Sequence, residues 1–116
     1  MAKYVLMLLE DERWTKQTPK DEKDRAYAVL NAWWTDLQSK GVVLEGEELQ
    51  PKDTATTVRR VNGTMKVSDG PFIESKEHVG GFAMIEVEDL DEAIAIAKSW
   101  PGGDVEVRPI VDHTGS

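Results

Sequence analysis

Residues 69–82 read Asp69-Gly70-Pro71-Phe72-Ile73-Glu74-Ser75-Lys76-Glu77-His78-Val79-Gly80-Gly81-Phe82. Two strand-like runs flank this stretch, which combines turn-forming residues with three acids, a lysine and a histidine. Its glycines and its proline favour turns and close approach of two backbones. A loop that only turned the chain would need fewer charges. The stretch is therefore both the strongest turn signal in the chain and its first candidate for a functional loop.

The pattern on either side of this stretch predicts a mixture of strands and helices. Apolar and β-branched runs predict strands over residues 3–10, 42–44, 54–61, 64–68, 81–87 and 104–110. Apolar residues at helical spacing predict helices over residues 18–41 and 89–100. The dipeptide Asn62-Gly63 predicts a two-residue hairpin turn between two of the strands.

Both predicted helices have a start signal and an apolar stripe. Thr18 can cap the first helix and Pro19 suits its first position, while Asp89 opens a capping box in the second. The buried faces are expected to hold Ala26, Val29, Leu30, Trp33 and Leu37 in the first helix and Leu90, Ala93, Ala97 and Trp100 in the second. Tyr27 and Trp34 form another stripe beside the first, wider than a small domain usually needs.

The order of elements is β-α-β, a hairpin, then β-α-β. Two βαβ units with right-handed crossovers form a ferredoxin-like α+β sandwich with both helices on one face of the sheet. The strands are apolar on both sides, so the other face also needs cover. Two such sheets packed face to face would give a dimeric α+β barrel. We therefore expect an obligate homodimer of one domain over residues 1–111, followed by a flexible tail over residues 112–116.

The composition argues against several classes of function. The chain has 116 residues, of which 40% are hydrophobic and 31% charged, as in one soluble globular domain. A net charge of −8 repels phosphate backbones and argues against nucleic-acid binding. No apolar run reaches the roughly 20 residues that span a bilayer, so no membrane association is expected. The absence of cysteine favours a cytoplasmic location.

The candidate catalytic groups all lie in the 69–82 stretch: Asp69, Glu74, Lys76 and Glu77. This stretch leads from the hairpin into a central strand, so we expect it beside a cavity at the mouth of the barrel. Burial raises a carboxyl pKa and a nearby ammonium lowers it, and carboxyls in opposed environments can divide acid and base roles. A small organic acid or a lactone-like, enolisable molecule is a plausible substrate. The sequence does not decide between an enzyme and a protein that only binds.

Other side chains are candidate ligand contacts: Glu10, Arg59, Phe72, His78 and Arg108. Glu10 ends the first strand and is expected near the same mouth. Arg59 and Arg108 lie on strands, where a guanidinium that faces the cavity could hold an anion through its planar fork. An ion pair with Glu106 or with a loop carboxylate is the alternative for either arginine. His78 is either a general base or a solvated surface residue.

A purely structural role for the stretch is equally open. Gly70-Pro71 would set a turn, Phe72 and Val79 would anchor the loop to the core, and the two glutamates would pair with Lys76. A metal site would need more histidines, and His113 lies in the tail. No cofactor or metal is therefore expected.

Several segments together carry a family resemblance: Glu10-Asp11-Glu12, Thr54-Ala55-Thr56-Thr57-Val58-Arg59, Asp69-Gly70-Pro71-Phe72 with Glu74, Lys76 and Glu77, Gly80-Gly81-Phe82, residues 89–97 and residues 105–109. This combination resembles the YCII-related, DGPF-domain family of small bacterial proteins. The resemblance covers nearly the whole chain and implies the dimeric α+β barrel. Ile73, Ser75 and His78 depart from the usual residues of the motif, and we find no counterpart of the His-Asp pair proposed for some relatives.

Two functional hypotheses follow. The first is a dimeric small-molecule-binding protein, with or without catalysis, whose polar determinants lie in the 69–82 stretch. The resemblance extends to a superfamily with muconolactone-type dehalogenases, which is compatible with such a role. The second is a non-catalytic interaction module for an extracytoplasmic-function sigma factor or an enzyme partner, because related proteins are often encoded beside such factors and some carry a "transcription initiation" description. The second hypothesis predicts an exposed apolar patch beyond the dimer interface.

Overall fold

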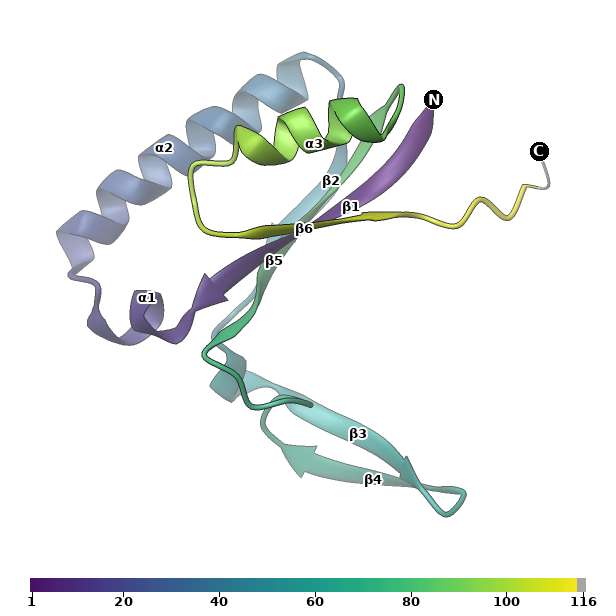
Figure 1. Ribbon diagram of the computed structural model, residues 1–116. Coiled ribbons are helices and arrows are strands. Elements are labelled where there is room, and N and C mark those ends of the chain that lie inside the picture. Colours follow the sequence, from purple (N-terminus) through teal and green to yellow (C-terminus); the bar gives the residue numbers. More distant parts are fainter. Residues whose placement is uncertain (115–116) are drawn as a thin grey trace.

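A computed structural model describes residues 1–114 of the chain (Figure 1). The elements follow in the order β1 (Ala2–Asp11), α1 (Glu12–Gln17), α2 (Lys20–Ser39), β2 (Val43–Glu48), a single 3₁₀ turn η1 (Lys52–Thr54), β3 (Thr56–Val61), β4 (Thr64–Asp69), β5 (Glu77–Val87), α3 (Leu90–Lys98) and β6 (Val105–Pro109). Within this described part, no helix is both long enough and apolar enough to cross a bilayer.

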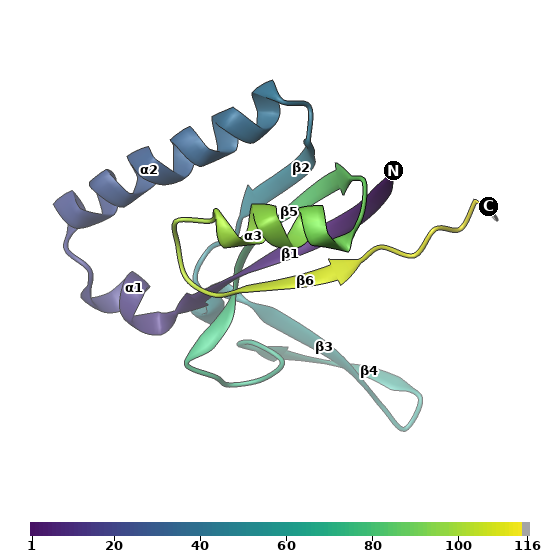
Figure 2. The ribbon, with the colours of Figure 1, turned by 45° about the horizontal axis from the view of Figure 1, so that its top comes forward.

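The body of the protein is a four-stranded sheet in the order β2-β5-β1-β6. Every neighbouring pair of strands in it is antiparallel. The helices α2 and α3 lie on the same side of the sheet, as Figure 1 and Figure 2 both show. This is the α+β, ferredoxin-like arrangement that the order of elements predicts, and the opposite face of the sheet carries no helix in the described chain. The dimeric barrel stays a prediction.

The core lies between the two central strands and α3. Leu6 of β1 stands opposite Ala83 of β5 in the register, and both are fully buried together with Ile85. Ala93 of α3 is buried against this cluster. Leu37, near the end of α2, is the buried residue of that helix. Because this contact is at one end, α2 packs closely on the body there and leaves room beneath its first turns.

The hairpin of β3 and β4 forms a separate two-stranded sheet that projects away from the body (Figure 1). Its turn is the predicted Asn62-Gly63, with φ of 50° and 81°, which matches the left-handed pair that a type I′ turn requires. Val58 stands opposite Val67, and these two with Met65 are half or more exposed. An isolated hairpin is marginally stable in water, so this apolar face needs further contacts.

The structure corrects several element boundaries. The helix α1 is not predicted, since six residues are too few to show an apolar period. It uses the Thr18 hydroxyl to donate to the Arg13 carbonyl at 3.5 Å, so Pro19, not Thr18, takes the N-cap position of α2. The strand β5 begins at Glu77 instead of Gly81 because residues 77–79 continue the ladder with β1.

Two residues predicted to be buried are exposed. Val29 is 54% exposed because α2 stands away from the sheet at that point, and Leu90 is 46% exposed because it is the first residue of α3. The predicted N-cap of α3 is present, with the Glu92 N–H donating to Asp89 Oδ1 at 3.0 Å, but the Glu92 carboxylate accepts from the Glu88 N–H at 2.8 Å instead of from the Asp89 N–H that a capping box requires. The predicted tail is described only as far as Thr114, and residues 115–116 lie outside the described part.

Candidate functional site

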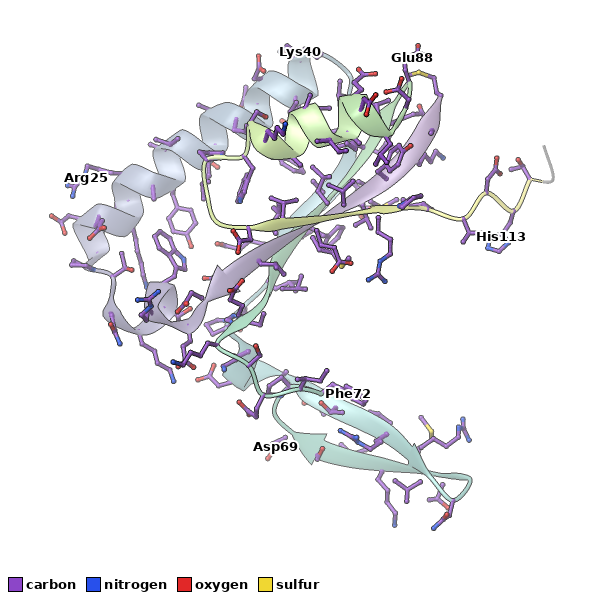
Figure 3. All side chains as sticks on the ribbon, viewed as in Figure 1. Arg25, Lys40, Asp69, Phe72, Glu88 and His113 are labelled. Atoms are coloured by element: carbon purple, nitrogen blue, oxygen red, sulfur yellow. The ribbon has the colours of Figure 1, made fainter. Side chains whose placement is uncertain are left out.

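The predicted catalytic groups of the loop are exposed and lie apart from one another. Asp69 ends β4 opposite Thr56, and Figure 3 shows it with Phe72 on the hairpin side of the molecule. Glu74, 79% exposed at its side chain, reaches Lys52 at 3.6 Å. Lys76 and Glu77 are likewise exposed at the start of β5. Within residues 1–114, none of the four lines either of the two hollows described below, and their catalytic role stays a prediction.

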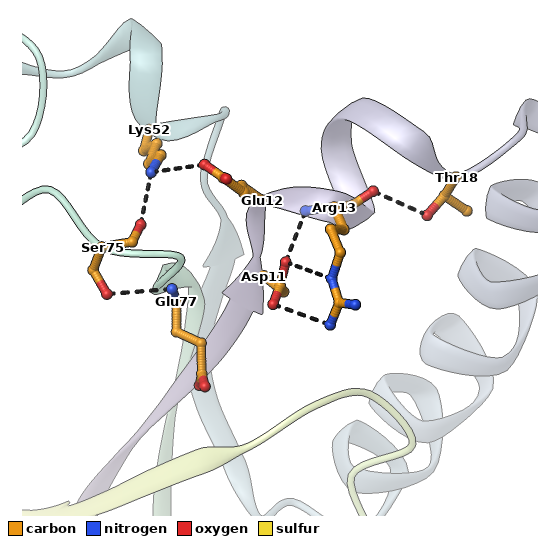
Figure 4. Close-up of polar contacts among 7 residues, drawn as sticks. All are labelled: Asp11, Glu12, Arg13, Thr18, Lys52, Ser75 and Glu77. Atoms are coloured by element: carbon orange, nitrogen blue, oxygen red, sulfur yellow. Dashed lines mark hydrogen bonds and ion pairs between the residues drawn. The ribbon is translucent and has the colours of Figure 1, made fainter.

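Lys52 organises the loop. Its ammonium lies 3.2 Å from Glu12 Oε2 and donates to the Ser75 carbonyl at 2.6 Å (Figure 4). It also lies 3.6 Å from Glu74 Oε2. We call these four residues the Lys52 cluster. The Lys52 side chain is only 15% exposed. The hydrogen bond between Lys52 and Glu12 raises the pKa of the lysine and lowers that of the glutamate.

Backbone contacts reinforce this attachment. The Glu12 N–H donates to the Lys76 carbonyl at 3.0 Å, and the Glu77 N–H donates to Ser75 Oγ at 3.3 Å. Asp11 caps α1 by accepting from the Arg13 N–H at 2.8 Å (Figure 4). The loop is therefore fixed to the junction of β1 and α1. The expected anchors are wrong in detail, because Phe72 and Val79 are 62% and 38% exposed and Glu74 pairs with Lys52 instead of Lys76.

The two predicted anion-binding arginines have partners elsewhere. The Arg59 guanidinium lies 4.2 Å from the centre of the Phe72 ring and donates to the Phe72 carbonyl at 3.4 Å. Arg108 forms an ion pair with Glu106 on β6, which is the alternative weighed from the sequence. Within residues 1–114, neither arginine is among the residues that line the two hollows described below. A ligand-binding role for Arg59, Phe72 or Arg108 stays a prediction.

A cavity of about 700 Å³ lies between α2 and the sheet. We call it the α2 cavity. Its size falls in the range of small-molecule sites. Its walls are formed by Leu8, Leu9, Glu10, Asp11, Trp14, Ala26, Tyr27, Val29, Leu30, Asn31, Trp34, Gly46, Glu47, Glu48, Gly80, Gly81, Phe82, Trp100, Pro101, Gly102 and Gly103. The end of the predicted stretch, Gly80-Gly81-Phe82, belongs to this wall, whereas its charged residues do not.

Glycines in the strands make room for large side chains at the cavity. A Cβ placed on Gly46 would lie 2.3 Å from the Trp34 ring, and one on Gly80 would lie 2.1 Å from Glu10 Oε2. Such contacts are shorter than real Cβ atoms make, so only glycine fits beneath Trp34 and Glu10 as they stand. The Trp34 indole of α2 thereby packs down onto β2 at Gly46, and the Glu10 carboxylate of β1 lies over Gly80 of β5.

Glu10 occupies the polar end of the cavity. Burial raises the pKa of its carboxyl above the ordinary value, and the nearby His78 and the Thr15 hydroxyl at 3.5 Å offset this only in part. The Glu48 carboxylate, across the cavity, raises it further. A carboxyl with a raised pKa can gain and lose a proton closer to neutral pH than an exposed one.

Tyr27 connects α2 to this polar end. Its hydroxyl donates to Glu48 Oε2 at 2.8 Å, and its ring meets Trp14 edge to face at 6.1 Å between centroids. Burial, the hydrogen bond to Glu48 and the charges of Glu48 and Glu10 raise the pKa of Tyr27 to about 12. The phenol therefore stays a neutral donor at physiological pH.

His78 stands opposite Glu10 in the ladder between β1 and β5. Directly opposed side chains share one face of a sheet and lie within contact range. Both ring nitrogens are buried, and neither has a hydrogen-bond partner among residues 1–114. Buried polar atoms usually have partners. The ring nitrogens of His78 are therefore shielded from solvent beside the half-buried Glu10 carboxyl. A role for His78 as a general base stays a prediction.

Comparison with known proteins agrees with this fold. A sequence model of the YCII-related domain matches residues 3–114. The chain belongs to the YCII-related family. An uncharacterized protein of Rhizobium meliloti (strain 1021) is 33% identical to it over 112 residues, which cover 92% of this chain and 90% of that relative. The predicted family resemblance is confirmed.

The cavity of this YCII-related protein was only partly foreseeable. Glu10 and His78 were predicted as ligand contacts, and the structure brings these two together. The second stripe of α2, Tyr27 and Trp34, marks the side of the helix that faces the cavity. Its unusual width is the sequence feature that could have predicted the cavity. Trp14 gave no signal, since it lies on the unpredicted α1. Among the described residues, no group of His, Asp or Glu side chains could hold a metal ion.

Proposed function

We propose that this YCII-related protein binds a small organic molecule in the α2 cavity. The observation that carries the proposal is a cavity of about 700 Å³ with aromatic walls and a half-buried, ionisable Glu10 at one end. A mostly apolar pocket with a few converging polar groups is the usual form of a ligand site. Groups with perturbed pKa values gather at such sites.

We further propose that, if the protein is an enzyme, Glu10 and His78 rather than the loop residues move the proton. Glu10 faces the cavity, and His78 adjoins it with free ring nitrogens. An uncharged lactone-like or enolisable substrate suits this site better than an organic acid, because Glu10 and Glu48 repel an anion. Asp69, Glu74, Lys76 and Glu77 would then fix the loop and contribute no chemistry.

Tryptophan fluorescence offers a direct test, because three of the four tryptophans line the cavity. We expect members of a panel of neutral lactones and cyclic ketones to change this fluorescence in a saturable way. Ala26→Leu should abolish the change, since Ala26 lines the cavity, while Ala32→Leu on the exposed side of the same helix should leave it intact. Equal effects of the two substitutions would contradict the proposal.

We propose that the uncovered face of the sheet forms a homodimer interface. Val5 and Met7 of β1 alternate with the core residues, as do Phe82 and Met84 of β5, so their side chains lie on the helix-free face and are only partly buried. Apolar faces of this kind pair in dimeric barrels. Analytical ultracentrifugation should give a dimer that Met84→Asp converts to a monomer. A wild-type monomer at micromolar concentration would contradict this proposal.

One observation favours the interaction-module alternative. The exposed face of the hairpin carries Val58, Met65 and Val67, an apolar patch separate from the sheet face. A partner such as a sigma factor is here an expectation from the resemblance alone. If Val67→Asp removes co-purification of a partner without changing ligand binding or the dimer, the protein has this second role.

A further inference from the structure

The ionised side chains in the wall of the α2 cavity have one sign. The acidic residues of the wall are Glu10, Asp11, Glu47 and Glu48, of which Glu47 has the register of the opposite sheet face and the others can present their carboxylates to the cavity. No lysine, arginine or histidine belongs to the wall within residues 1–114. Clefts lined by one sign of charge with apolar walls concentrate ligands of the opposite sign. The cavity therefore discriminates among ligands by charge as well as by shape.

Two of these acids are not neutralised by an ion pair. Asp11 pairs with Arg13 at 3.2 Å. Within the described chain, by contrast, neither Glu10 nor Glu48 forms a salt bridge; Glu48 accepts from Tyr27, and Glu10 has only the long contact from Thr15. Their mutual repulsion contributes to the raised pKa of Glu10. A positive group between them would relieve this repulsion.

Aromatic rings supply the second half of a cation site. Trp14, Tyr27, Trp34 and Trp100 all line the cavity. A cation over the face of a tryptophan or tyrosine ring is attracted by the ring quadrupole, and cages of such rings recognise ammonium ligands. The chain already shows this contact, since the Lys23 ammonium lies 5.9 Å from the centre of the Trp14 ring.

Lys23 does not satisfy the site by itself. Its ammonium donates to the Thr15 carbonyl at 3.0 Å and borders a smaller hollow of about 250 Å³ beside the main cavity. Lys23 faces the carboxylates of Glu10 and Glu48 there, and His78 adjoins Glu10 from the neighbouring strand. Within residues 1–114 neither of these two basic side chains forms a salt bridge with either carboxylate, so a ligand cation can still pair with them. The Trp100 Nε1 is also buried, without a hydrogen-bond partner in the described chain, and it remains available to a polar group on the ligand.

We propose that the α2 cavity takes an organic monocation, an amine or quaternary ammonium with an apolar body, whose charge lies between Glu10 and Glu48 and whose body lies against the tryptophans. This inference rests on the proposed binding function and names the class of ligand for the same cavity. It replaces the organic acid suggested by the sequence.

Three probes of similar shape test the proposal: benzylammonium, benzyl alcohol and benzoate. Binding is followed by tryptophan fluorescence and by ligand-observed NMR at low ionic strength and pH 8. We expect the cation to bind at least about fivefold more tightly than the neutral alcohol, and benzoate to show no binding. Equal affinity for cation and alcohol, or preference for benzoate, would overturn the inference.

Matched variants locate the charge effect. Glu48→Gln keeps an acceptor for Tyr27 and should reduce the preference for benzylammonium over benzyl alcohol to below about twofold, while Glu45→Gln on the same strand, facing the opposite side of the sheet, should not. If benzyl alcohol binds and benzylammonium binds no more tightly than the alcohol, the inference fails and the proposed function stands. If no probe binds and Ala26→Leu changes no signal with the lactone and ketone panel, both fail.

Discussion

The loop over residues 70–76 and the wall of the α2 cavity contain similar side chains in very different surroundings. In the loop, carboxylates are exposed and Lys52 reaches both Glu12 and Glu74. In the cavity, burial and then the charge of Glu48 raise the pKa of Glu10, and neither glutamate forms a salt bridge within residues 1–114. The loop carboxylate Glu74 is thus paired with Lys52, whereas the cavity carboxylates Glu10 and Glu48 form no salt bridge in the described chain.

The two sets of charges therefore have different roles: those of the loop attach it to the body, and those of the cavity are available to a ligand. Exposed ion pairs contribute little to stability and nothing to selectivity for a ligand. Buried polar atoms without partners are costly, and they persist in proteins where they have a role. Of the charged side chains in the DGPF stretch, Glu74 joins the Lys52 cluster that attaches the loop to the body, while the charges beneath α2 mark the candidate site.

The largest expected effect contrasts the body with the hairpin. Leu6→Ala should cost about 2–5 kcal/mol of unfolding free energy, because Leu6 is fully buried. Val67→Ala should cost less than about 0.5 kcal/mol, because Val67 is 69% exposed. Urea denaturation measures both. A cost above about 1 kcal/mol at Val67 would show that the hairpin is covered in solution, for example by a second copy of the chain. The hairpin would then not differ from the body in burial as proposed.

A second prediction concerns the glycine beneath the cavity wall. Gly46→Ala would place a Cβ 2.3 Å from the Trp34 ring and 2.5 Å from the Phe82 carbonyl oxygen. Overpacking of this kind costs about 1–3 kcal/mol, and Trp34 should move into the cavity. The thermal midpoint should fall and the near-ultraviolet circular dichroism of the tryptophans should change. An unaltered tryptophan signal would mean that Trp34 does not rest on Gly46.

The sequence predicts the body of this fold well because its signals are local. Alternating apolar residues, the Asn62-Gly63 turn and the Asp89 N-cap each specify an element without long-range information. The position of α2 is different: whether Tyr27 and Trp34 line a cavity or fill a core depends on how close the helix lies to the sheet. That distance is set by contacts such as Trp33 with Trp100, at 4.9 Å between ring centroids, which no local pattern reveals.

The candidate site was predictable only through Glu10 and His78. Both were visible as ionisable residues next to apolar strands, but their pairing depends on an irregularity of the ladder between Leu8 and Leu9 that shifts the register. The sequence instead favours the loop acids as catalytic groups, because charges that are close together in sequence suggest a cluster in space. In space these acids separate, since Asp69 ends one strand and Glu77 begins another.

A third prediction releases the hairpin without unfolding the body. Lys52→Met removes the ammonium that joins Glu12, Glu74 and the Ser75 carbonyl. Amide hydrogens of β3 and β4 should exchange faster, while those of β1 and β5 stay protected, because local opening precedes global unfolding. Lys66→Met on β4 is the matched control, since Lys66 is exposed. The same exchange rates in both variants would mean that Lys52 does not hold the hairpin.

The smallest expected effects are those of pH on the stability of the folded protein. They have opposite signs at Glu10 in the cavity and at Glu12 beside the loop, so the pH dependence distinguishes the two regions. Burial raises the folded-state pKa of Glu10 above its ordinary value of 4.5, so the folded protein binds the proton more tightly and loses stability as pH rises through that window. Lys52 lowers the folded-state pKa of Glu12 below 4.5, so this group contributes stability above pH 4.5 that is lost as pH falls through the lower folded value.

Glutamine substitutions at Glu10 and Glu12 allow these two pH dependences to be measured. Glu10→Gln should raise the thermal midpoint at pH 7.5, with the gain vanishing toward pH 4, because a neutral side chain no longer suffers from burial of charge. Glu12→Gln should lower the midpoint at pH 7.5, with the loss vanishing toward pH 3, and Glu45→Gln should change it at neither pH. If Glu10→Gln instead lowers the midpoint at pH 7.5, the Glu10 carboxylate already has a stabilising cation in the protein, and the cavity offers no unmatched charge to a ligand.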